Sequence, residues 1–380
     1  MIQPANRLQE TKEYYFSRKL KEVRALEAAG HPIINMGIGS PDVAAPAAVV
    51  EALKKGLESP KAHQYQSYTG IPELRDAIAG FYKKHYEVIL DPATEVLPLM
   101  GSKEGIMHIS MAFLNPGDKV LIPNPGYPTY SAVTKLVEAI PVFYDLDATH
   151  HWLPDLKALQ EQDLSQVKMM WVNYPHMPTG AIVQEGFFKE LIAFAKANNI
   201  LIINDNPYSF ILNDHPTSIL AIEGAKEVAL ELNSLSKSFN MAGWRVGMVM
   251  GGKTHINHIL KVKSNMDSGM FYGIQQGAIA ALQLDDSWFV SINDIYRKRR
   301  NLIYTLARKL DCTYSEDSVG LFVWAKLPDG IDAEQFIDTV LLEKYLFITP
   351  GTIFGSQGEG YIRFSLCVTE DQIRKAIDRF

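Results

Sequence analysis

Residues 228–250 read VALELNSLSKSFNMAGWRVGMVM, in which two apolar runs, VALEL and VGMVM, border a loop of small and polar residues. Short apolar runs beside Gly, Pro or Asn are typical of buried strands. Earlier runs of the same kind are EVLPLM (95–100), KVLIP (119–123), PVFYDL (141–146), MMWVN (169–173) and ILIIND (200–205). We therefore expect a central sheet of buried strands.

Helical patterns lie between several of these runs. KEGIMHISMAFL (103–114) has apolar residues at helical spacing and ends at Asn115-Pro116-Gly117. EGFFKELIAFAKANN (185–199) has a similar apolar stripe. Alternating strands and helices predict an α/β fold with a mostly parallel sheet and helices on both faces.

The two ends of the chain follow a different pattern. Residues 12–30 read as a charged amphipathic helix, and residues 287–310 read as a long basic helix. Short strands in 318–327 and 360–368 and helices around 333–345 and 370–379 complete an α+β pattern. We expect a large α/β domain over residues 45–285 and a smaller α+β domain formed by both termini, residues 1–44 and 286–380.

Composition excludes several classes of protein. The 380 residues are 47% hydrophobic, which argues against a disordered or collagen-like chain. A net charge of −6 predicts no attraction to nucleic acid or to anionic membranes. We interpret the basic run 297–300 as a solvated helix face, and the scattered histidines predict no metal site.

Cysteine content and the length of the apolar runs indicate in which cellular compartment the protein is expected. The 2 cysteines, without a C-x-x-C motif, cannot form a disulfide framework. The first residues lack the apolar segment of a signal peptide, and no apolar run is long enough to span a membrane. We expect a cytoplasmic protein.

Ligands of open α/β sheets bind outside the carboxyl ends of the strands, so the residues there are the candidate site. Gly101-Ser102-Lys103 follows a strand and opens a helix, where free N–H groups attract anions. Taken alone, this segment fits better an N-cap serine beside a surface lysine. Asp205, in Asp205-Asn206-Pro207-Tyr208, fits a buried carboxylate and a turn-forming residue equally well.

The loop between the two apolar runs of residues 228–250 is more informative about the site. Lys237 lies among small and apolar residues between two predicted strands, and lysine is rarely buried without a partner or a function. A solvated loop lysine is the second interpretation. Burial and nearby cations lower a lysine pKa, which prepares the amine to form an imine with a carbonyl. Ser234, Ser236 and Arg245 add anion-binding groups.

These segments together offer an amine, a carboxylate, a phenol and an anion-binding cradle. Pyridoxal 5′-phosphate (PLP) uses all of them, through its aldehyde, pyridine nitrogen, ring hydroxyl and phosphate. A lysine imine with an acidic partner for the ring nitrogen is the known signature of this cofactor. The residues therefore predict a PLP site.

The chain resembles the class I/II aminotransferases, PLP enzymes of fold type I, over nearly its whole length, and within them the LL-diaminopimelate aminotransferase branch. The segments that carry the resemblance are GIGSPD (37–42), HQYQSYTGIPELR (63–75), MGSKEG (100–105), PNPGYPTY (123–130), NYPHMPTG (173–180), NDNPY (204–208), SLSKSFNMAGWRVG (234–247), SNMDSG (264–269) and YIRFS (361–365).

The resemblance implies a role for each cofactor-binding residue. Lys237 would hold PLP as an imine and then move protons, Asp205 would pair with the pyridinium nitrogen, and Tyr208 would bind the ring hydroxyl. Tyr127 would stack on the ring. The phosphate would be held by Ser102, Lys103, Ser234, Ser236 and Arg245.

It also implies substrate contacts and a homodimer with shared active sites. Tyr65 would reach the phosphate from the partner subunit, and Ser268 would line the neighbour's site. Arg363 would bind the substrate α-carboxylate through its planar fork, with Gly39 giving room. Tyr14 would touch the substrate.

One position departs from the family pattern. Met177 stands before Pro-Thr-Gly, where relatives usually carry an Asn that donates to the ring hydroxyl and orients the arginine. A thioether is only a weak acceptor, so we expect Met177 to do neither. We expect altered tuning of the imine pKa without loss of the cofactor.

The resulting functional hypothesis is an aminotransferase. It would move an amino group between an L-amino acid, such as LL-diaminopimelate or aspartate, and a 2-oxo acid such as 2-oxoglutarate. The alternatives are a β-eliminating lyase or cyclising synthase on the same scaffold, and a non-catalytic PLP sensor. The sequence does not identify the residues that select the substrate side chain.

Overall fold

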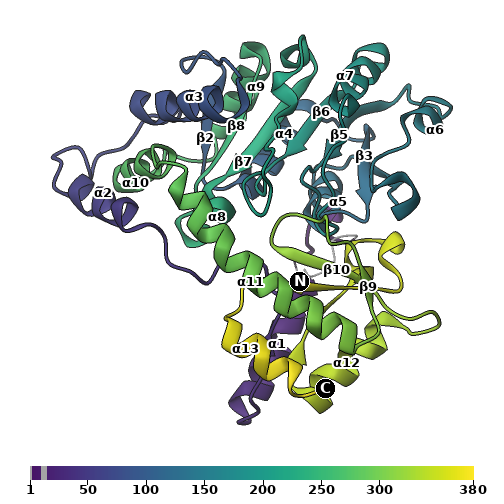
Figure 1. The fold of residues 1–380 in the computed structure, drawn as a ribbon. Helices are drawn as coiled ribbons and strands as arrows, with labels where there is room; N and C mark the ends of the chain where they lie inside the picture. Colours follow the sequence, from purple (N-terminus) through teal and green to yellow (C-terminus); the bar gives the residue numbers. More distant parts are fainter. Residues whose placement is uncertain (1, 10–14) are drawn as a thin grey trace.

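The computed structural model describes residues 2–9 and 15–380, and its centre is a seven-stranded sheet of order β2-β8-β7-β6-β5-β3-β4 (Figure 1). β8 runs antiparallel to its neighbours β2 and β7, and the other pairs are parallel. The seven strands coincide with the predicted runs: β2 (Val96–Leu99), β3 (Lys119–Asn124), β4 (Ile140–Asp145), β5 (Val167–Val172), β6 (Leu201–Asp205), β7 (Ala229–Ser234) and β8 (Gly247–Gly251). The expected mostly parallel sheet is confirmed.

Helices cover both faces of this sheet, as predicted. One face packs against α4 (Ser102–Phe113), α5 (Pro128–Leu136) and α9 (Lys253–Lys263), and the other against α3 (Pro72–Tyr86), α7 (Phe187–Asn198) and α10 (Tyr272–Leu282). Side chains alternate along a strand, so Trp171 of β5 belongs to the first apolar cluster while Met170 and Val172 belong to the second. α2 (Ala47–Leu57) packs on α10.

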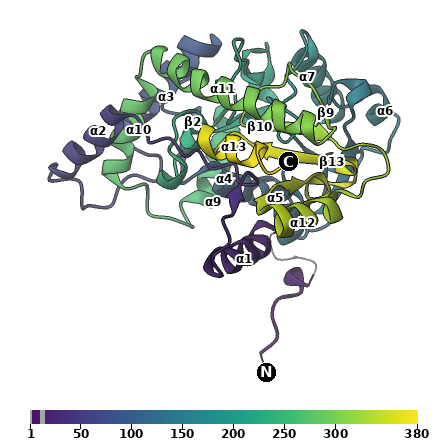
Figure 2. The ribbon, with the colours of Figure 1, turned by 60° about the horizontal axis from the view of Figure 1, so that its bottom comes forward.

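Both ends of the chain build a second unit (Figures 1 and 2). Its sheet has the order β12-β13-β10-β9, and β1 pairs with β11. One apolar cluster joins residues of the N-terminal helix to the C-terminal strands and helices. Its elements are α1 (Tyr15–Ala28), β1 (Ile34–Asn35), β9 (Thr313–Tyr314), β10 (Phe322–Lys326), α12 (Ala333–Lys344), β11 (Leu346–Phe347), β12 (Thr349–Pro350), β13 (Tyr361–Ser365) and α13 (Glu370–Ile377).

The long helix α11 (Ser287–Lys309) runs between the two units. Phe289, in its first turn, packs in the apolar cluster of the large sheet, whereas Ile292 and Tyr296 pack in the cluster of the small one. The packing of α11 thus changes from the large sheet's cluster to the small sheet's cluster within its first turns. The domain limits at residues 45 and 285 remain a prediction.

The interpretation of residues 297–300 as a solvated face is wrong for Arg299. Its side chain is buried, and its guanidinium binds both carboxylate oxygens of Asp42, at 2.6 and 2.9 Å, and the carbonyl of Leu366 at 3.0 Å. Arg300 donates to the Ser318 carbonyl. A basic run on a helix takes part in packing wherever it faces the core, because long side chains can carry a charge to a buried partner.

Within the described ranges, none of the helices combines the length and the apolar character that crossing a lipid bilayer requires.

Candidate active site

A cavity of about 460 Å³ opens where β5, β6 and β7 end, between the large sheet and the small sheet. Asn173 follows β5, Asp205 ends β6 and Ser234 ends β7, and all three line the cavity. Arg363 of β13 and Phe322 of β10 close it from the other side. The cavity therefore lies at the carboxyl edge of the sheet, as expected for an open α/β fold.

The structure brings most of the predicted site residues to this cavity. Tyr65 does not line it, with 92% of its surface exposed, and neither does Ser268. Both were predicted to serve the partner's site. Tyr14 lies outside the described residues. The lining residues that were predicted are Gly39, Ser102, Lys103, Tyr127, Asp205, Tyr208, Ser234, Ser236, Lys237, Arg245 and Arg363.

Lys237 lies on the short helix α8 (Leu235–Ser238), directly after β7. Its Nζ donates to the carbonyl oxygen of Gly39 at 2.5 Å. Burial lowers the pKa of Lys237, and the positive charges of Arg363 and Arg245 lower it further. A less basic amine more readily exposes the lone pair that adds to an aldehyde. Position and environment thus suit a covalent attachment point.

Asp205 holds a buried carboxylate with one unsatisfied oxygen. The Tyr130 hydroxyl donates to Oδ2 at 2.8 Å, while Oδ1 has no hydrogen-bond partner among the described residues. Burial raises the pKa of Asp205 to about 7, against the opposing effects of the Tyr130 bond and the Lys237 charge. A buried oxygen without a partner is costly, so this site fits a cationic N–H donor in the cavity.

Tyr130 is a site residue that the sequence analysis did not identify. It is fully buried, and its ring stacks on Trp171 with centroids 4.8 Å apart. The signal was present, because Tyr130 lies in the first turn of α5, three positions after Tyr127, which immediately precedes the helix; the two rings meet edge to face with centroids 5.6 Å apart.

A cradle for an anion lies at the start of α4. Gly101 has φ of 96°, and a Cβ added there would collide with the Arg245 guanidinium. Burial lowers the pKa of Lys103, and the charge of Arg245 lowers it further. Ser234 Oγ accepts from the Ser236 N–H at 3.0 Å and donates to Ser236 Oγ at 2.8 Å. Two cations, hydroxyls and a helix N-terminus together suit a phosphate group.

Arg363 is held at the opposite end of the cavity. Its Nη2 donates to the Gly37 carbonyl at 2.8 Å and its Nη1 to Met177 Sδ at 3.3 Å. The prediction that Met177 cannot help to orient the arginine is therefore wrong. The sulfur of methionine takes a guanidinium N–H because the side chain lies buried beside it. Gly39 leaves the space that the Phe322 ring fills.

Comparison with known proteins decides the family. The family model for aminotransferase class I and II matches residues 31–380. The chain belongs to the class I and II aminotransferases. These enzymes depend on PLP, and so does this aminotransferase; the predicted fold type, activity and cofactor are confirmed.

Individual relatives of this aminotransferase match over nearly their whole length. The LL-diaminopimelate aminotransferase of Oleidesulfovibrio alaskensis is 42% identical, covering 99% of this chain and 97% of its own. The enzyme of the same name from Aquifex aeolicus is 39% identical, covering 100% and 98%. The apo structure of BacF from Bacillus subtilis has a TM-score of 0.96 at 36% identity, covering 100% and 98%.

The cavity of this aminotransferase fits PLP on its own geometry. The unpaired Oδ1 of Asp205 requires a cationic donor, which a protonated pyridine nitrogen provides, and the cradle of Ser102, Lys103 and Arg245 suits a phosphate. When bound, PLP supplies an electron sink for the substrate α-carbon and stores the amino group between the two halves of the reaction.

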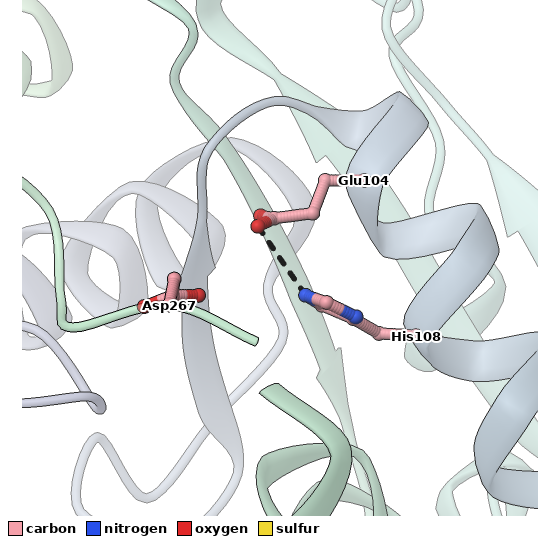
Figure 3. A group of neighbouring side chains, drawn as sticks. All are labelled: Glu104, His108 and Asp267. Carbon is pink, nitrogen blue, oxygen red and sulfur yellow. Dashed lines mark ion pairs between the residues drawn. The ribbon is translucent and has the colours of Figure 1, made fainter. Parts of the chain in front are cut away.

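A second cluster of ionisable side chains lies beside α4 in this aminotransferase (Figure 3). Glu104, His108 and Asp267 each offer one atom, and these atoms lie within 4.8 Å of one another. Glu104 Oε1 is 3.3 Å from His108 Nε2, and Lys263 Nζ is 2.8 and 2.7 Å from the Asp267 oxygens. The buried Lys263 ammonium already supplies a positive charge to Asp267, so we assign no metal here, and the absence of a metal remains a prediction.

Proposed function

We propose that this aminotransferase moves the amino group of an L-amino acid to a 2-oxo acid such as 2-oxoglutarate. The observation that carries the proposal is that Lys237, Asp205 and Arg363 face one cavity beside a phosphate cradle. An amine, a carboxylate and a guanidinium in this arrangement meet the needs of amino transfer between carboxylate substrates.

Lys237 is the proposed catalytic residue. Its Nζ would be the attachment point for PLP, and as a free amine it would accept the substrate α-proton and return it. The lowered pKa supports this role, because a base must reach its neutral form at working pH to accept a proton.

Asp205 and Tyr208 are the proposed partners of the cofactor ring. Asp205 Oδ1 would accept from the ring nitrogen, and the carboxylate charge would keep that nitrogen protonated. Tyr208 would donate its hydroxyl to the ring oxygen, since burial raises the pKa of Tyr208 and keeps it protonated. Tyr127 would cover the ring face. The proposed phosphate ligands are Ser102, Lys103, Ser234, Ser236 and Arg245.

Arg363 is the proposed site for the substrate α-carboxylate. Its bonds to Gly37 and Met177 fix the plane of the guanidinium, and a planar fork can bind two carboxylate oxygens at once. Gly39 would support this site through the space it leaves for Phe322. The names of the relatives make LL-diaminopimelate one candidate donor.

We also propose a homodimer with shared active sites. Large apolar side chains are exposed around α2 and α10 and the loops beside them, including Tyr65 (92%), Met266 (59%), Tyr68 (45%) and Phe271 (42%). Exposed apolar groups of this size favour a subunit interface, and Tyr65 would then reach the partner's phosphate cradle. Light scattering of the purified protein measures the assembly, and a monomer would overturn this part.

Two further expectations stay proposals. The domain division, with residues 45–285 in the large domain, is supported by the separate apolar clusters of the two sheets. A cytoplasmic location is supported by Cys312 and Cys367, which are both free and buried.

The function is tested by a half-reaction without an acceptor. An L-amino acid donor should convert the absorbance of the aldehyde form of the cofactor to that of its amine form, and 2-oxoglutarate should restore it. Release of ammonia and pyruvate instead would indicate a lyase. Lys237→Ala should bind PLP without a bond that borohydride can reduce, and a reducible adduct in this variant would remove Lys237 from its role.

A further inference from the structure

We propose that Gln275 of α10 is a positioning residue for the partner subunit's active site. It joins the loop of residues 63–70, which carries Tyr65, to the loop of residues 264–270, which carries Ser268. The inference rests on the proposed function and its homodimer, because it takes Tyr65 to reach the phosphate cradle of the partner subunit. It adds a residue that itself touches neither the substrate nor the cofactor.

Both ends of the Gln275 side-chain amide are used, one for each loop. The side chain is fully buried, with an exposed fraction of 0%. Its Oε1 accepts from the Ile71 N–H at 2.8 Å, directly after the 63–70 loop, and its Nε2 donates to the Met270 carbonyl at 2.7 Å, at the end of the 264–270 loop. A side chain of similar size without the amide would leave both backbone groups without this partner, which is costly in a buried place.

The two loops also touch one another directly. Gly269 has φ of 87°, and a Cβ added there would lie 2.5 Å from the Gln66 carbonyl oxygen and 2.8 Å from that of Ser67. Backbone therefore lies against backbone, with no room for a side chain between the loops. Only glycine allows both the left-handed backbone and this close approach without strain.

Each loop is also fixed from within. In the 63–70 loop, Gln66 Nε2 donates to the Gln64 carbonyl at 2.8 Å. In the 264–270 loop, the oxygens of Asp267 accept from the buried Lys263 ammonium at 2.8 and 2.7 Å, and Oδ1 also accepts from the Gly269 N–H at 2.8 Å. The two loops and Gln275 thus form one supported unit.

This unit presents its most exposed side chains to solvent. Tyr65 is 92% exposed, Met266 59% and Tyr68 45%, and Ser268 is exposed as well. An ordered loop that leaves its aromatic rings in water stabilises its own chain little, so its order suits contact with another chain. Because the loops are ordered before they meet the partner, less conformational entropy is lost when they bind.

Loss of the amide tests the role of Gln275. Gln275→Leu keeps a side chain of similar size but removes both hydrogen bonds. Fluorescence titration of the apoenzyme with PLP should give a Kd about tenfold higher than wild type, because loosened loops must be ordered again before Tyr65 can bind the phosphate. A wild-type Kd in the folded variant would overturn the inference.

Heterodimers with two different affinity tags show in which subunit Gln275 acts. The first pairs a Gln275→Leu chain with a Lys237→Ala chain. The only remaining Lys237 then receives intact loops from its partner. Its covalent attachment of PLP, counted by borohydride reduction and mass mapping, should need the same PLP concentration as wild type. The same heterodimer should also carry out the half-reaction at the wild-type rate per site.

The second heterodimer pairs a wild-type chain with a chain that carries both substitutions. Its only Lys237 receives weakened loops and should need about tenfold more PLP. The opposite pattern in the two heterodimers would show that Gln275 serves its own subunit, which overturns the inference and leaves the proposed function intact. A wild-type enzyme without the half-reaction would instead count against the proposed function, whatever the heterodimers show.

A second variant acts at the surface and leaves the buried amide in place. Gly269→Ala pushes the two loops apart at their backbone contact and should reproduce the rise in Kd and the heterodimer pattern of Gln275→Leu. Gly80→Ala on α3 is the matched control, because its added Cβ meets open space, and its Kd for PLP should be unchanged. A wild-type Kd in Gly269→Ala would overturn the inference, since the joined loops would then not matter to the site.

Discussion

Asp205 should make the stability of the apoprotein depend on pH. Burial raises the pKa of its carboxyl from an ordinary 3.8 to about 7 in the folded chain. Between these values the folded state binds a proton that the unfolded state lacks, so the free energy of unfolding falls as the pH rises through this range. Asp205→Asn removes the ionisable group and keeps its shape.

The size of the effect follows from the two pKa values. Between pH 5 and pH 8 the folded carboxyl loses its proton, whereas the unfolded one is ionised throughout. At about 1.36 kcal/mol per pH unit, wild-type apoprotein should lose about 2–3 kcal/mol more than Asp205→Asn over this interval. Titrating groups that do not interact with Asp205 contribute equally to both proteins and cancel in the comparison.

Urea unfolding provides the assay. The cofactor is removed with phenylhydrazine, and both apoproteins are unfolded at pH 5 and at pH 8 under otherwise identical conditions. Parallel pH dependences of the two proteins would show that Asp205 ionises normally, and the argument from its buried, unpaired oxygen would fail. Added PLP should reduce the difference, because a cationic partner favours the carboxylate.

Three other substitutions test separate parts of the site. Tyr130→Phe removes the hydroxyl that binds Asp205 at 2.8 Å; it should cost about 1.5–3 kcal/mol of stability and raise the Asp205 pKa further, measured by the same urea titration. Gly101→Ala adds a Cβ at φ of 96° where Arg245 lies, so PLP affinity should fall about tenfold by fluorescence titration; unchanged affinity would argue against the cradle. Arg363→Lys loses the planar fork and should lower kcat/KM about 100-fold, mainly through KM; a wild-type KM would place the α-carboxylate elsewhere.

The sequence predicted the large sheet well because six of its seven strands are buried along most of their length. All seven apolar runs became strands, since a continuous apolar run of this length has few other stable environments. The proposed site residues at or near the carboxyl ends of these strands, such as Asp205 and Lys237, followed from the same logic. These residues lie close together because the carboxyl ends of parallel strands meet at one edge of the sheet.

Residues that act through contacts distant in sequence were harder to predict. The sequence analysis assigned no role to Phe322 and Phe354, and only the fold shows that their rings flank Arg363. The hydrogen bond from Arg363 to Met177 joins residues 186 positions apart, so no local sequence pattern predicts it. Arg299 was assigned to the solvent because its partner, Asp42, is distant in sequence.

Helix α11 has a mechanical consequence. Its first turn is anchored in one core through Phe289, and its later turns belong to the other core through Ile292 and Tyr296. A helix resists bending, so a rotation of the C-terminal unit would have its hinge near this junction. Such a rotation would displace Arg363, on β13, relative to the large sheet. Binding of a donor carboxylate at the proposed Arg363 site would then be coupled to rotation of one unit against the other.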